Sequence, residues 1–350
     1  MTGSPRRILA IQTAYLGDCV LTLPLLREAK ALYPRSRLSV LALPKTAALF
    51  EEFPAVDEVL ADDKRGEDSG LLGMLRLAGR LRSRAFDLAI IPHRSLRSAL
   101  IARLAGIPRR VGFASSAGWF LMTRRAPFDW ATHDLDRNLS LLKAIDPSFY
   151  PSKDVWRDVA ASDHARASLA ARWESLRLAP GAPVVGLHAG SAWGTKRWPE
   201  DRWAELCRRL KSQGFKPLLV GGPDDAELSK RVAAASGAES LAGTTSLGEL
   251  KALMEKFSLF VTNDSGPMHV ACAMGVPVLA IFGPTVRGLG FFPYGIRNEV
   301  AEADLACRPC PGSLHGPMKC PHGHFLCMKL VTVDEVFSRA MRMLACGVRL

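Results

Sequence analysis

The sequence lacks a long uninterrupted hydrophobic run. Its most apolar stretch, residues 268–282, is broken by His269, Gly275 and Pro277 and is shorter than the roughly 20 apolar residues that a membrane-spanning helix needs. The N-terminal arginines are followed by a short apolar run, Ile8–Ile11, whereas a secretory signal peptide needs about 7–15 apolar residues. The sequence therefore predicts a protein that stays in the cytoplasm.

Two nucleotide-binding signatures are also missing. Neither G-x-G-x-x-G nor G-x-x-x-x-G-K-[ST] occurs in the chain, so a dinucleotide-dependent dehydrogenase and a P-loop kinase lose their main support. Aromatic residues make up only 7% of the chain, and no nucleic-acid recognition module or aromatic stacking platform is visible. We therefore expect no nucleic-acid partner.

Acidic residues are few: 34 stand against 46 basic residues, which gives a formal net charge of +12. The excess is concentrated in the window 76–137, where twelve arginines face four aspartates. A basic surface of this kind attracts an anionic partner, such as a membrane surface or an anionic substrate. The alternative is an arginine-rich face that only contacts solvent.

The order of the expected elements predicts the fold. A chain of 350 residues corresponds to about two domains, and a segment rich in Pro and Gly, 178–183, is typical of a linker. Short strands rich in Val, Ile and Leu alternate with helical stretches, which is typical of parallel α/β sheets. We therefore expect two Rossmann-like, doubly wound domains, 1–178 and 179–350, with a ligand cleft between them at the carboxyl ends of the strands. The expected strands are 8–11, 38–43, 58–60, 88–91, 184–188, 217–220, 259–262 and 277–282.

A loop of small residues follows the expected strand 184–188. Its sequence, AGSAWGTKRWP over 189–199, contains Gly190, Ser191 and Lys196. Small residues let backbone N–H groups approach an oxyanion, and Lys196 adds a positive charge. The loop is therefore a candidate phosphate site; the alternative is an ordinary loop with a solvated Lys-Arg pair.

A second candidate follows the strand 259–262, in the segment TNDSGPMH. Ser265 is the expected N-cap of a helix, with Pro267 near the first helical position. The free N–H groups of such a helix suit a phosphate. His269 lies one turn further on, and Asp264, at the strand end, could hold a sugar hydroxyl or a phosphate-bound water.

This segment, together with KRWP at 196–199 and FGPT at 282–285, resembles glycosyltransferase family 9, the ADP-heptose:lipopolysaccharide heptosyltransferases, and most of all heptosyltransferase II. The resemblance extends from Gly17-Asp18 to the C-terminal cysteines. It implies a GT-B fold, an inverting, metal-independent reaction, and transfer of L-glycero-D-manno-heptose from ADP-heptose to heptosyl-Kdo2-lipid A. The alternatives are another family 9 transferase of the heptosyltransferase I or III type, with a different acceptor or donor, and a non-catalytic module that binds nucleotide sugars.

The resemblance also implies roles for single residues. Asp18 corresponds to the general base that deprotonates the acceptor hydroxyl; the alternative for Asp18 is an N-cap of a helix starting at Val20. Eight residues would bind the donor: Gly190, Ser191, Lys196, Asp225, Asp264, Ser265, Gly266 and His269.

The acceptors of this family carry Kdo carboxylates and lipid A phosphates and lie in the inner membrane leaflet. The arginine window matches them in charge, and the candidate acceptor contacts are Arg94, Arg97, Arg124 and Arg125. We therefore expect an anionic lipid-linked saccharide as acceptor and peripheral contact with the cytoplasmic face of the inner membrane.

Four of the eight cysteines fall close together near the C-terminus, as C-x2-C-x9-C-x6-C: Cys307, Cys310, Cys320 and Cys327. Two interpretations stay open, a structural zinc site with four thiolates and reduced thiols packed in a C-terminal loop. No cofactor is expected for catalysis.

Overall fold

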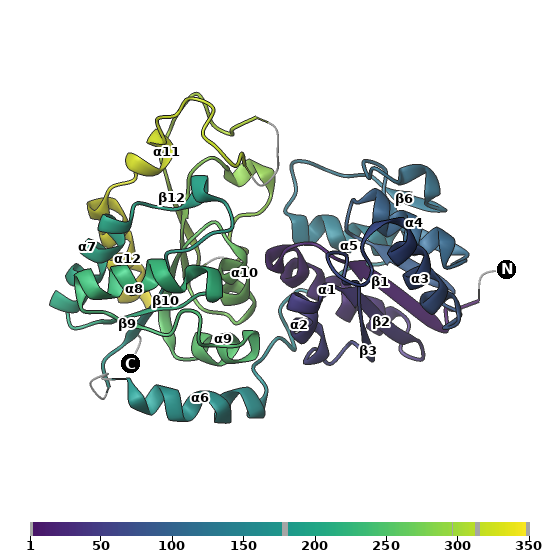
Figure 1. Cartoon of the computed structure of the whole chain (residues 1–350), viewed down its shortest axis with the longest axis horizontal. Helices are drawn as coiled ribbons and strands as arrows, with labels where there is room; N and C mark the ends of the chain where they lie inside the picture. Colours follow the sequence, from purple (N-terminus) through teal and green to yellow (C-terminus); the bar gives the residue numbers. More distant parts are fainter. Residues whose placement is uncertain (1–2, 177–180, 296, 312–315, 348–350) are drawn as a thin grey trace. The chain divides into compact units, whose positions relative to one another are not determined.

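A computed structural model describes the whole chain except residues 1–2, 177–180, 296, 312–315 and 348–350. The chain forms two compact units, Met1–Val159 and Ala160–Leu350 (Figure 1). Each unit has its own parallel sheet and its own hydrophobic core. Among the residues described, no helix is long and apolar enough to cross a bilayer.

The sheet of the first unit has six parallel strands in the order β3-β2-β1-β4-β5-β6. The strand order reverses between β1 and β4, which makes this pair the topological switch point where α/β proteins place ligands. The central strands are buried on both faces, as their apolar sequences predict. The strands are β1 (Arg7–Gln12), β2 (Arg37–Ala42), β3 (Glu58–Ala61), β4 (Leu88–Ile91), β5 (Arg109–Phe113) and β6 (Arg124–Ala126).

Helices cover this sheet. The inner sides of α3 (Gly70–Arg82) and α4 (Leu96–Leu104) pack on Leu9 and Ile11 of β1 and form the hydrophobic core of that face. Helices α1 (Leu16–Leu32) and α5 (Asp134–Ile145) pack against each other. The remaining elements are short: η1 (Pro44–Thr46), α2 (Ala47–Glu51) and η2 (Trp119–Leu121).

The second unit repeats this strand order. Its sheet runs β12-β11-β10-β7-β8-β9, which is the same order once the strands are counted from β7, and its switch point lies between β7 and β10. The strands are β7 (Val184–His188), β8 (Lys216–Leu219), β9 (Glu239–Ser240), β10 (Phe257–Asn263), β11 (Val278–Phe282) and β12 (Glu299–Glu302). The expected pair of Rossmann-like, doubly wound parallel sheets is therefore confirmed.

The helical elements of the second unit lie between and after these strands. They are α6 (Asp163–Ser175), η3 (Gly194–Lys196), α7 (Glu200–Ser212), η4 (Pro223–Asp225), α8 (Ala226–Ser236), α9 (Leu247–Met254), α10 (Gly266–Ala273), η5 (Arg287–Leu289), α11 (Leu326–Lys329) and α12 (Val333–Gly347).

Helix α6 belongs to the second unit, although the sequence analysis places it before the linker. Arg166 forms a salt bridge with Glu255 at 2.9 Å, and the Ser168 hydroxyl donates to Glu249 at 2.7 Å. The compact units therefore divide at 159/160, earlier than the expected boundary at 178/179. Part of the expected linker 178–183 lies outside the described residues.

Candidate functional site

In the second unit, the loops that follow β7 and β10 meet at the switch point. The two strands pair with His188 beside Thr262, so the next residues of both chains lie together. The buried amide of Asn263 holds them: its Nδ2 donates to the carbonyls of Ala189 (2.8 Å) and Gly190 (3.0 Å), and its Oδ1 accepts from the Trp198 N–H (3.1 Å). One side chain thus fixes both ends of the loop that carries Lys196.

Lys196 is buried and paired. Its Nζ lies 2.6 Å from Oδ2 of Asp264, which also accepts from the Thr285 hydroxyl at 2.6 Å. Side-chain exposure is 6% for Lys196 and 7% for Asp264, so the alternative interpretation, in which Lys196 is solvated, is wrong. The indole of Trp193 stands 5.5 Å from the same ammonium group. Separating a buried ion pair leaves an uncompensated charge in the interior, which is unfavourable. The Lys196 ammonium group is therefore held next to Asp264.

A histidine that sequence reasoning did not select joins this edge. His188 ends β7; its Nε2 lies 3.1 Å from Oδ2 of Asp225, and its Nδ1 lies 3.0 Å from the Ser265 hydroxyl. Burial raises the pKa of Asp225, but the hydrogen bonds from His188 and from the Gly222 N–H outweigh it, so the pKa lies below its usual value. Asp225 is therefore held as a carboxylate beside the loop after β7.

Gly190 lies directly against the carboxylate of Asp225. A Cβ at this position would lie 1.8 Å from Oδ1 of Asp225, far inside contact distance. A Cβ at Gly194, in the same loop, would meet nothing within 4 Å. The close approach of Gly190 to Asp225 ties the loop after β7 to the turn after β8.

The first turn of α10 completes the edge. Ser265 is the N-cap, as expected, but its hydroxyl faces His188 and Thr262 and does not cap the helix. Gly266 and Pro267 are the first two helical residues, and the leading N–H groups of a helix lack intrahelical acceptors. His269 is buried one turn further on. The N-terminus of α10 and Lys196 thus provide positive charge at the same sheet edge.

Most of the predicted donor residues are therefore brought together. Gly190, Ser191, Lys196, Asp225, Asp264 and Ser265 are linked by direct contacts or by His188. Gly266 follows in the chain. His188 could have been suspected as the one ionisable residue of the strand VVGLH, directly before the small-residue loop.

In the first unit, Asp18 lies in the first turn of α1, at the carboxyl end of β1. Tyr15 is the N-cap and α1 begins at Leu16, so the alternative that Asp18 caps a helix from Val20 is wrong. Gln12 Nε2 donates to the Thr22 hydroxyl at 2.7 Å, and that hydroxyl donates to the Asp18 carbonyl at 2.8 Å. These bonds fix the backbone from which the Asp18 carboxylate projects.

His93 and Lys64, which follow β4 and β3, both contact Thr13 after the end of β1. The Thr13 hydroxyl lies 3.1 Å from His93 Nδ1, and Lys64 Nζ donates to the Thr13 carbonyl at 2.8 Å. Burial, reinforced by the charges of Lys64 and Arg94, lowers the pKa of His93 to about 4. His93 is therefore neutral at pH 7 and acts as a hydrogen-bonding group at this edge.

A second carboxyl group lies near Asp18. Burial, with the negative charge of Asp18 as the next cause, raises the pKa of Asp134 to about 7, against the opposing effect of Arg137 and Arg94. The guanidinium carbons of Arg94 and Arg137 lie 4.2 and 4.6 Å from the centroid of the Phe128 ring. Asp18, Asp134 and the two arginines thus form one charged group on the first unit.

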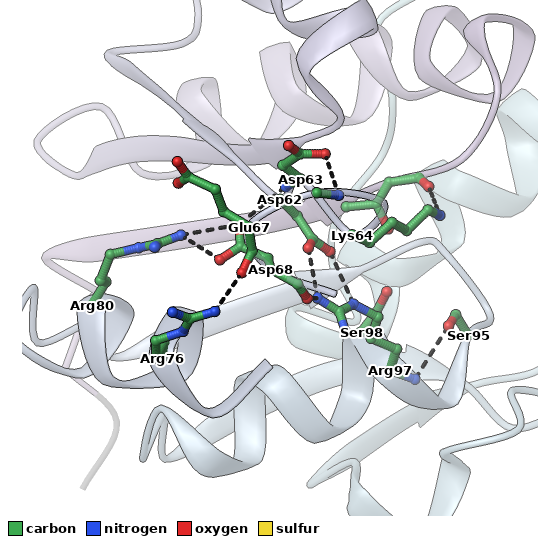
Figure 2. A network of polar contacts seen from close by, with 12 residues as sticks. Asp62, Asp63, Lys64, Glu67, Asp68, Arg76, Arg80, Ser95, Arg97 and Ser98 are labelled. Atoms are coloured by element: carbon green, nitrogen blue, oxygen red, sulfur yellow. Dashed lines mark hydrogen bonds and ion pairs between the residues drawn. The ribbon is translucent and has the colours of Figure 1, made fainter. Parts of the chain in front are cut away.

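The four arginines proposed for the acceptor differ in their surroundings. Arg97 is held by Asp62, with Nη2 at 2.7 Å from Oδ1, and it also donates to the Asp68 carbonyl at 2.7 Å (Figure 2). Arg124 donates to the carbonyls of residues 144 and 145 at the C-terminus of α5. These two side chains therefore have internal partners.

Arg94 and Arg125 are bound less tightly. Arg94 stacks on Phe128, and its guanidinium reaches the Ser115 hydroxyl only at 3.5 Å. Arg125 lies over the Trp119 ring at 5.2 Å. Since stacking leaves most guanidinium N–H groups available, these two arginines retain donors for an anion.

The cysteine-rich segment packs on the donor edge. Cys310 N–H donates to the Pro284 carbonyl at 2.9 Å, and Arg308 Nη2 donates to the Thr285 carbonyl at 2.8 Å. Burial is the main cause that raises the pKa values of Cys310 and Cys327, and the neighbouring thiols add to it. Within the described residues, no three or more Cys, His, Asp or Glu side chains are arranged to hold a metal ion, so the structure does not support the zinc interpretation.

Comparison with known proteins agrees with this geometry. The lipopolysaccharide heptosyltransferase 2 of Escherichia coli is 29% identical over 293 residues, covering 80% of this chain and 83% of its own. The lipopolysaccharide heptosyltransferase 1 of Pseudomonas aeruginosa is 29% identical over 319 residues, covering 87% and 86%. The solved structure of E. coli ADP-heptose lipopolysaccharide heptosyltransferase II superposes with a TM-score of 0.77 at 24% identity, covering 97% of this chain and 99% of that one. The family model for glycosyltransferase family 9 (heptosyltransferase) matches residues 74–315. The chain therefore belongs to glycosyltransferase family 9 and is a glycosyltransferase with a GT-B fold.

Proposed function

We propose that the protein transfers L-glycero-D-manno-heptose from ADP-heptose to the inner core of lipopolysaccharide, with inversion at the anomeric carbon. The observation that carries this proposal is the buried Lys196–Asp264 pair beside the N-terminus of α10, at the switch point of the second unit. Such an edge suits the diphosphate of a nucleotide sugar. The two relatives described above are named as lipopolysaccharide heptosyltransferases, which supports the choice of donor sugar and acceptor.

In the proposed reaction, the acceptor hydroxyl oxygen forms a bond to the anomeric carbon while the bond from that carbon to the ADP diphosphate oxygen breaks. The hydroxyl proton passes to the carboxylate of Asp18, the general base. ADP leaves with an additional negative charge, which Lys196 and the N–H groups of α10 stabilise. A single displacement of this kind inverts the configuration.

We propose that catalysis needs no metal ion, because Lys196 and the α10 N-terminus supply the positive charge that a divalent cation supplies elsewhere. Transfer in excess EDTA should equal transfer with Mg²⁺. Loss of transfer in EDTA that Mg²⁺ or Mn²⁺ restores would contradict this. We do not extend the proposal to a structural zinc ion, because the described cysteines do not form a metal site.

The acceptor is proposed to be heptosyl-Kdo2-lipid A, reached by peripheral contact with the cytoplasmic face of the inner membrane. A different acceptor is the second candidate, because the heptosyltransferase 1 of P. aeruginosa is as similar to the chain, at 29% identity, as heptosyltransferase 2 of E. coli. Under both candidate functions the donor would bind at the same sheet edge of the second unit, and the two functions would differ in the acceptor that the first unit binds.

The deciding experiment is a transfer assay with ADP-heptose and with UDP- and GDP-sugars. The acceptors are Kdo2-lipid A, its heptosylated form and a fully extended inner core. Transfer from ADP-heptose to the heptosylated acceptor confirms the proposal. Transfer to Kdo2-lipid A alone points to the second candidate. Turnover of none of the donors contradicts both.

A further inference from the structure

The outer surface of α3, α4 and η2 is unusually apolar for a face directed to solvent. Leu72 is 75% exposed, Leu71 66% and Phe120 61%. The inner side of α3 packs into the core through Met74, Leu77 and Leu81, so the outer leucines are not part of that core. The residues that make up this apolar surface are Leu71, Leu72 and Leu75 of α3, Leu96 and Leu104 of α4, and Trp119 and Phe120 of η2.

The three elements are neighbours, because α4 contacts both α3 and η2. Arg97, in the first turn of α4, binds Asp62 and the Asp68 carbonyl and so ties α4 to the turn before α3 (Figure 2). On the other side of α4, the chain before η2 packs closely: a Cβ on Gly118 would lie 2.4 Å from the Ala99 Cβ and 3.4 Å from a Leu96 methyl carbon. Helix α4 is therefore joined by direct contacts to the turn before α3 and to the chain before η2.

The charge around this surface is mostly positive. Residues 62–125, which include the turn before α3, contain thirteen basic residues and five acidic ones, Asp62, Asp63, Glu67, Asp68 and Asp87. Arg76 is exposed in the same helix as the outer leucines, and Arg103 is exposed beside Leu104. Of the acidic groups in the turn before α3, Asp62 and Asp68 are buried and paired with Arg97 and Arg80 (Figure 2). Asp63 and Glu67 are not buried.

This combination selects one kind of partner. Exposed Leu and aromatic side chains bordered by arginines are typical of surfaces that lie in the headgroup region of a bilayer, where apolar groups insert and arginines contact lipid phosphates. A second copy of the chain would bring two arginine-rich surfaces together, which like charge opposes. The N-termini of α3 and α4 follow β3 and β4, so the surface borders the sheet edge that carries Asp18.

We propose that the apolar surface of α3, α4 and η2, with its surrounding arginines, docks the first unit onto an anionic lipid bilayer. The inference rests on the proposed function in one respect: it takes the partner to be the membrane that holds the acceptor. It goes beyond that function by assigning the contact to particular side chains.

The test is flotation of the full chain with vesicles of phosphatidylcholine alone and of phosphatidylcholine with phosphatidylglycerol in equal parts. The wild type should bind the anionic vesicles at least about fivefold more strongly, as expected from one or more arginines near lipid phosphates. The variants Leu72→Ser/Phe120→Ser and Arg76→Gln/Arg103→Gln should each lose at least about fivefold of that binding. The matched control is Met318→Ser/Leu330→Ser, which removes exposed apolar side chains from the second unit and should bind as the wild type.

Two results would overturn the inference: a wild type that does not float with anionic vesicles, or a control that loses as much binding as the Leu72/Phe120 variant. The first result would favour an acidic protein as the partner. Circular dichroism of each variant checks folding. An assay of heptose transfer to a delipidated, water-soluble acceptor distinguishes the docking proposal from the proposed function. The docking variants should transfer heptose to this acceptor as the wild type does. A chain that floats through this surface but transfers no heptose would contradict the proposed function and leave the docking surface intact.

Discussion

In both units the strand order reverses between the first and the fourth strand, and ionisable residues gather at the carboxyl edge of that pair. In the second unit the Lys196 ammonium group is paired with Asp264, and His188 forms a hydrogen bond with the Asp225 carboxylate. In the first unit burial, and next the negative charge of Asp18, raise the pKa of Asp134, and burial lowers the pKa of His93. The same topology therefore builds two different electrostatic sites. A prearranged, charge-matched edge suits the binding of a diphosphate, and an edge with a carboxyl group of raised pKa suits proton transfer.

The largest difference between the two sheet edges is expected from Asp18→Asn, which should affect turnover and not ADP affinity. The amide keeps the shape and cannot accept a proton, so turnover should fall about 10²–10⁴-fold, the usual contribution of a general base. ADP affinity, measured by calorimetry, should stay unchanged because the donor residues lie in the second unit. Asp163→Asn is the matched control, an exposed first-turn aspartate of α6. Turnover of Asp18→Asn within a few fold of the wild type would remove the base assignment.

The next effect is expected from Lys196→Ala. Loss of a charge-assisted contact of roughly 1.5–3 kcal/mol should weaken ADP binding at least about tenfold. The variant should also unfold at a lower temperature, because Asp264 is left buried without its cation. Lys256→Ala, which removes an exposed lysine of the same unit, should change neither quantity. Unchanged ADP affinity in Lys196→Ala would contradict the phosphate assignment.

Gly190→Ala tests whether the stability and ADP affinity of the second unit depend on the close packing of Gly190 against Asp225. The added methyl group would collide with Asp225 and displace it from His188, at a cost of about 1–3 kcal/mol in stability. ADP affinity should fall with it. Gly194→Ala, in the same loop but with open space around it, should leave both unchanged. Equal melting temperatures of the two variants would show that the loop relaxes.

The smallest effect concerns Asp134 and the pH dependence of stability. Its pKa of about 7 is raised from 3.8, so the folded state binds this proton more tightly than the unfolded state does. Its contribution to the free energy of unfolding is therefore present below pH 4 and is lost as the pH rises to 7. The melting temperature of Asp134→Asn relative to the wild type should rise by a few degrees between pH 5 and pH 8.

The control for this prediction is Asp136→Asn, which changes an exposed aspartate in the same turn of α5. Its melting temperature relative to the wild type is measured over the same range, and a rise as large as that of Asp134→Asn would show that the effect is not specific to Asp134. A flat difference for Asp134→Asn would mean that the pKa of Asp134 is not raised in the folded protein. The contrast between the two edges would then be lost.

The strand pattern of both units is predictable from the sequence because fully buried parallel strands are continuous apolar runs, as in Val184–His188 and Leu88–Ile91. Strands β5, β6, β9 and β12 are not predicted from the sequence. Strand β9 has only two residues, and the apolar pattern of the other three is interrupted by Arg109, Arg110, Arg124, Arg125, Glu299 and Glu302. The boundary of the second unit is not predicted either, since α6 is attached by the ion pair of Arg166 with Glu255. No local pattern announces such a contact.

The site shows the same limit. The segment Asp264–Gly266 and Lys196 are identified from the sequence because glycine, proline and charge fall at strand ends. The pairing of Lys196 with Asp264, the role of His188 and the proximity of Asp134 to Asp18 come from residues far apart in the chain. Only the folded arrangement of the strand ends brings these groups together.

The indole of Trp193, 5.5 Å from the Lys196 ammonium group, gives the second unit an intrinsic fluorophore next to the proposed diphosphate site. Trp119 stands on the exposed surface of the first unit, below the guanidinium of Arg125. Nucleotide should change the emission of the former, and a vesicle with a quencher in its acyl chains should dim the latter. Variants in which one of these tryptophans at a time is replaced by phenylalanine would therefore allow nucleotide binding and vesicle binding to be followed separately by fluorescence.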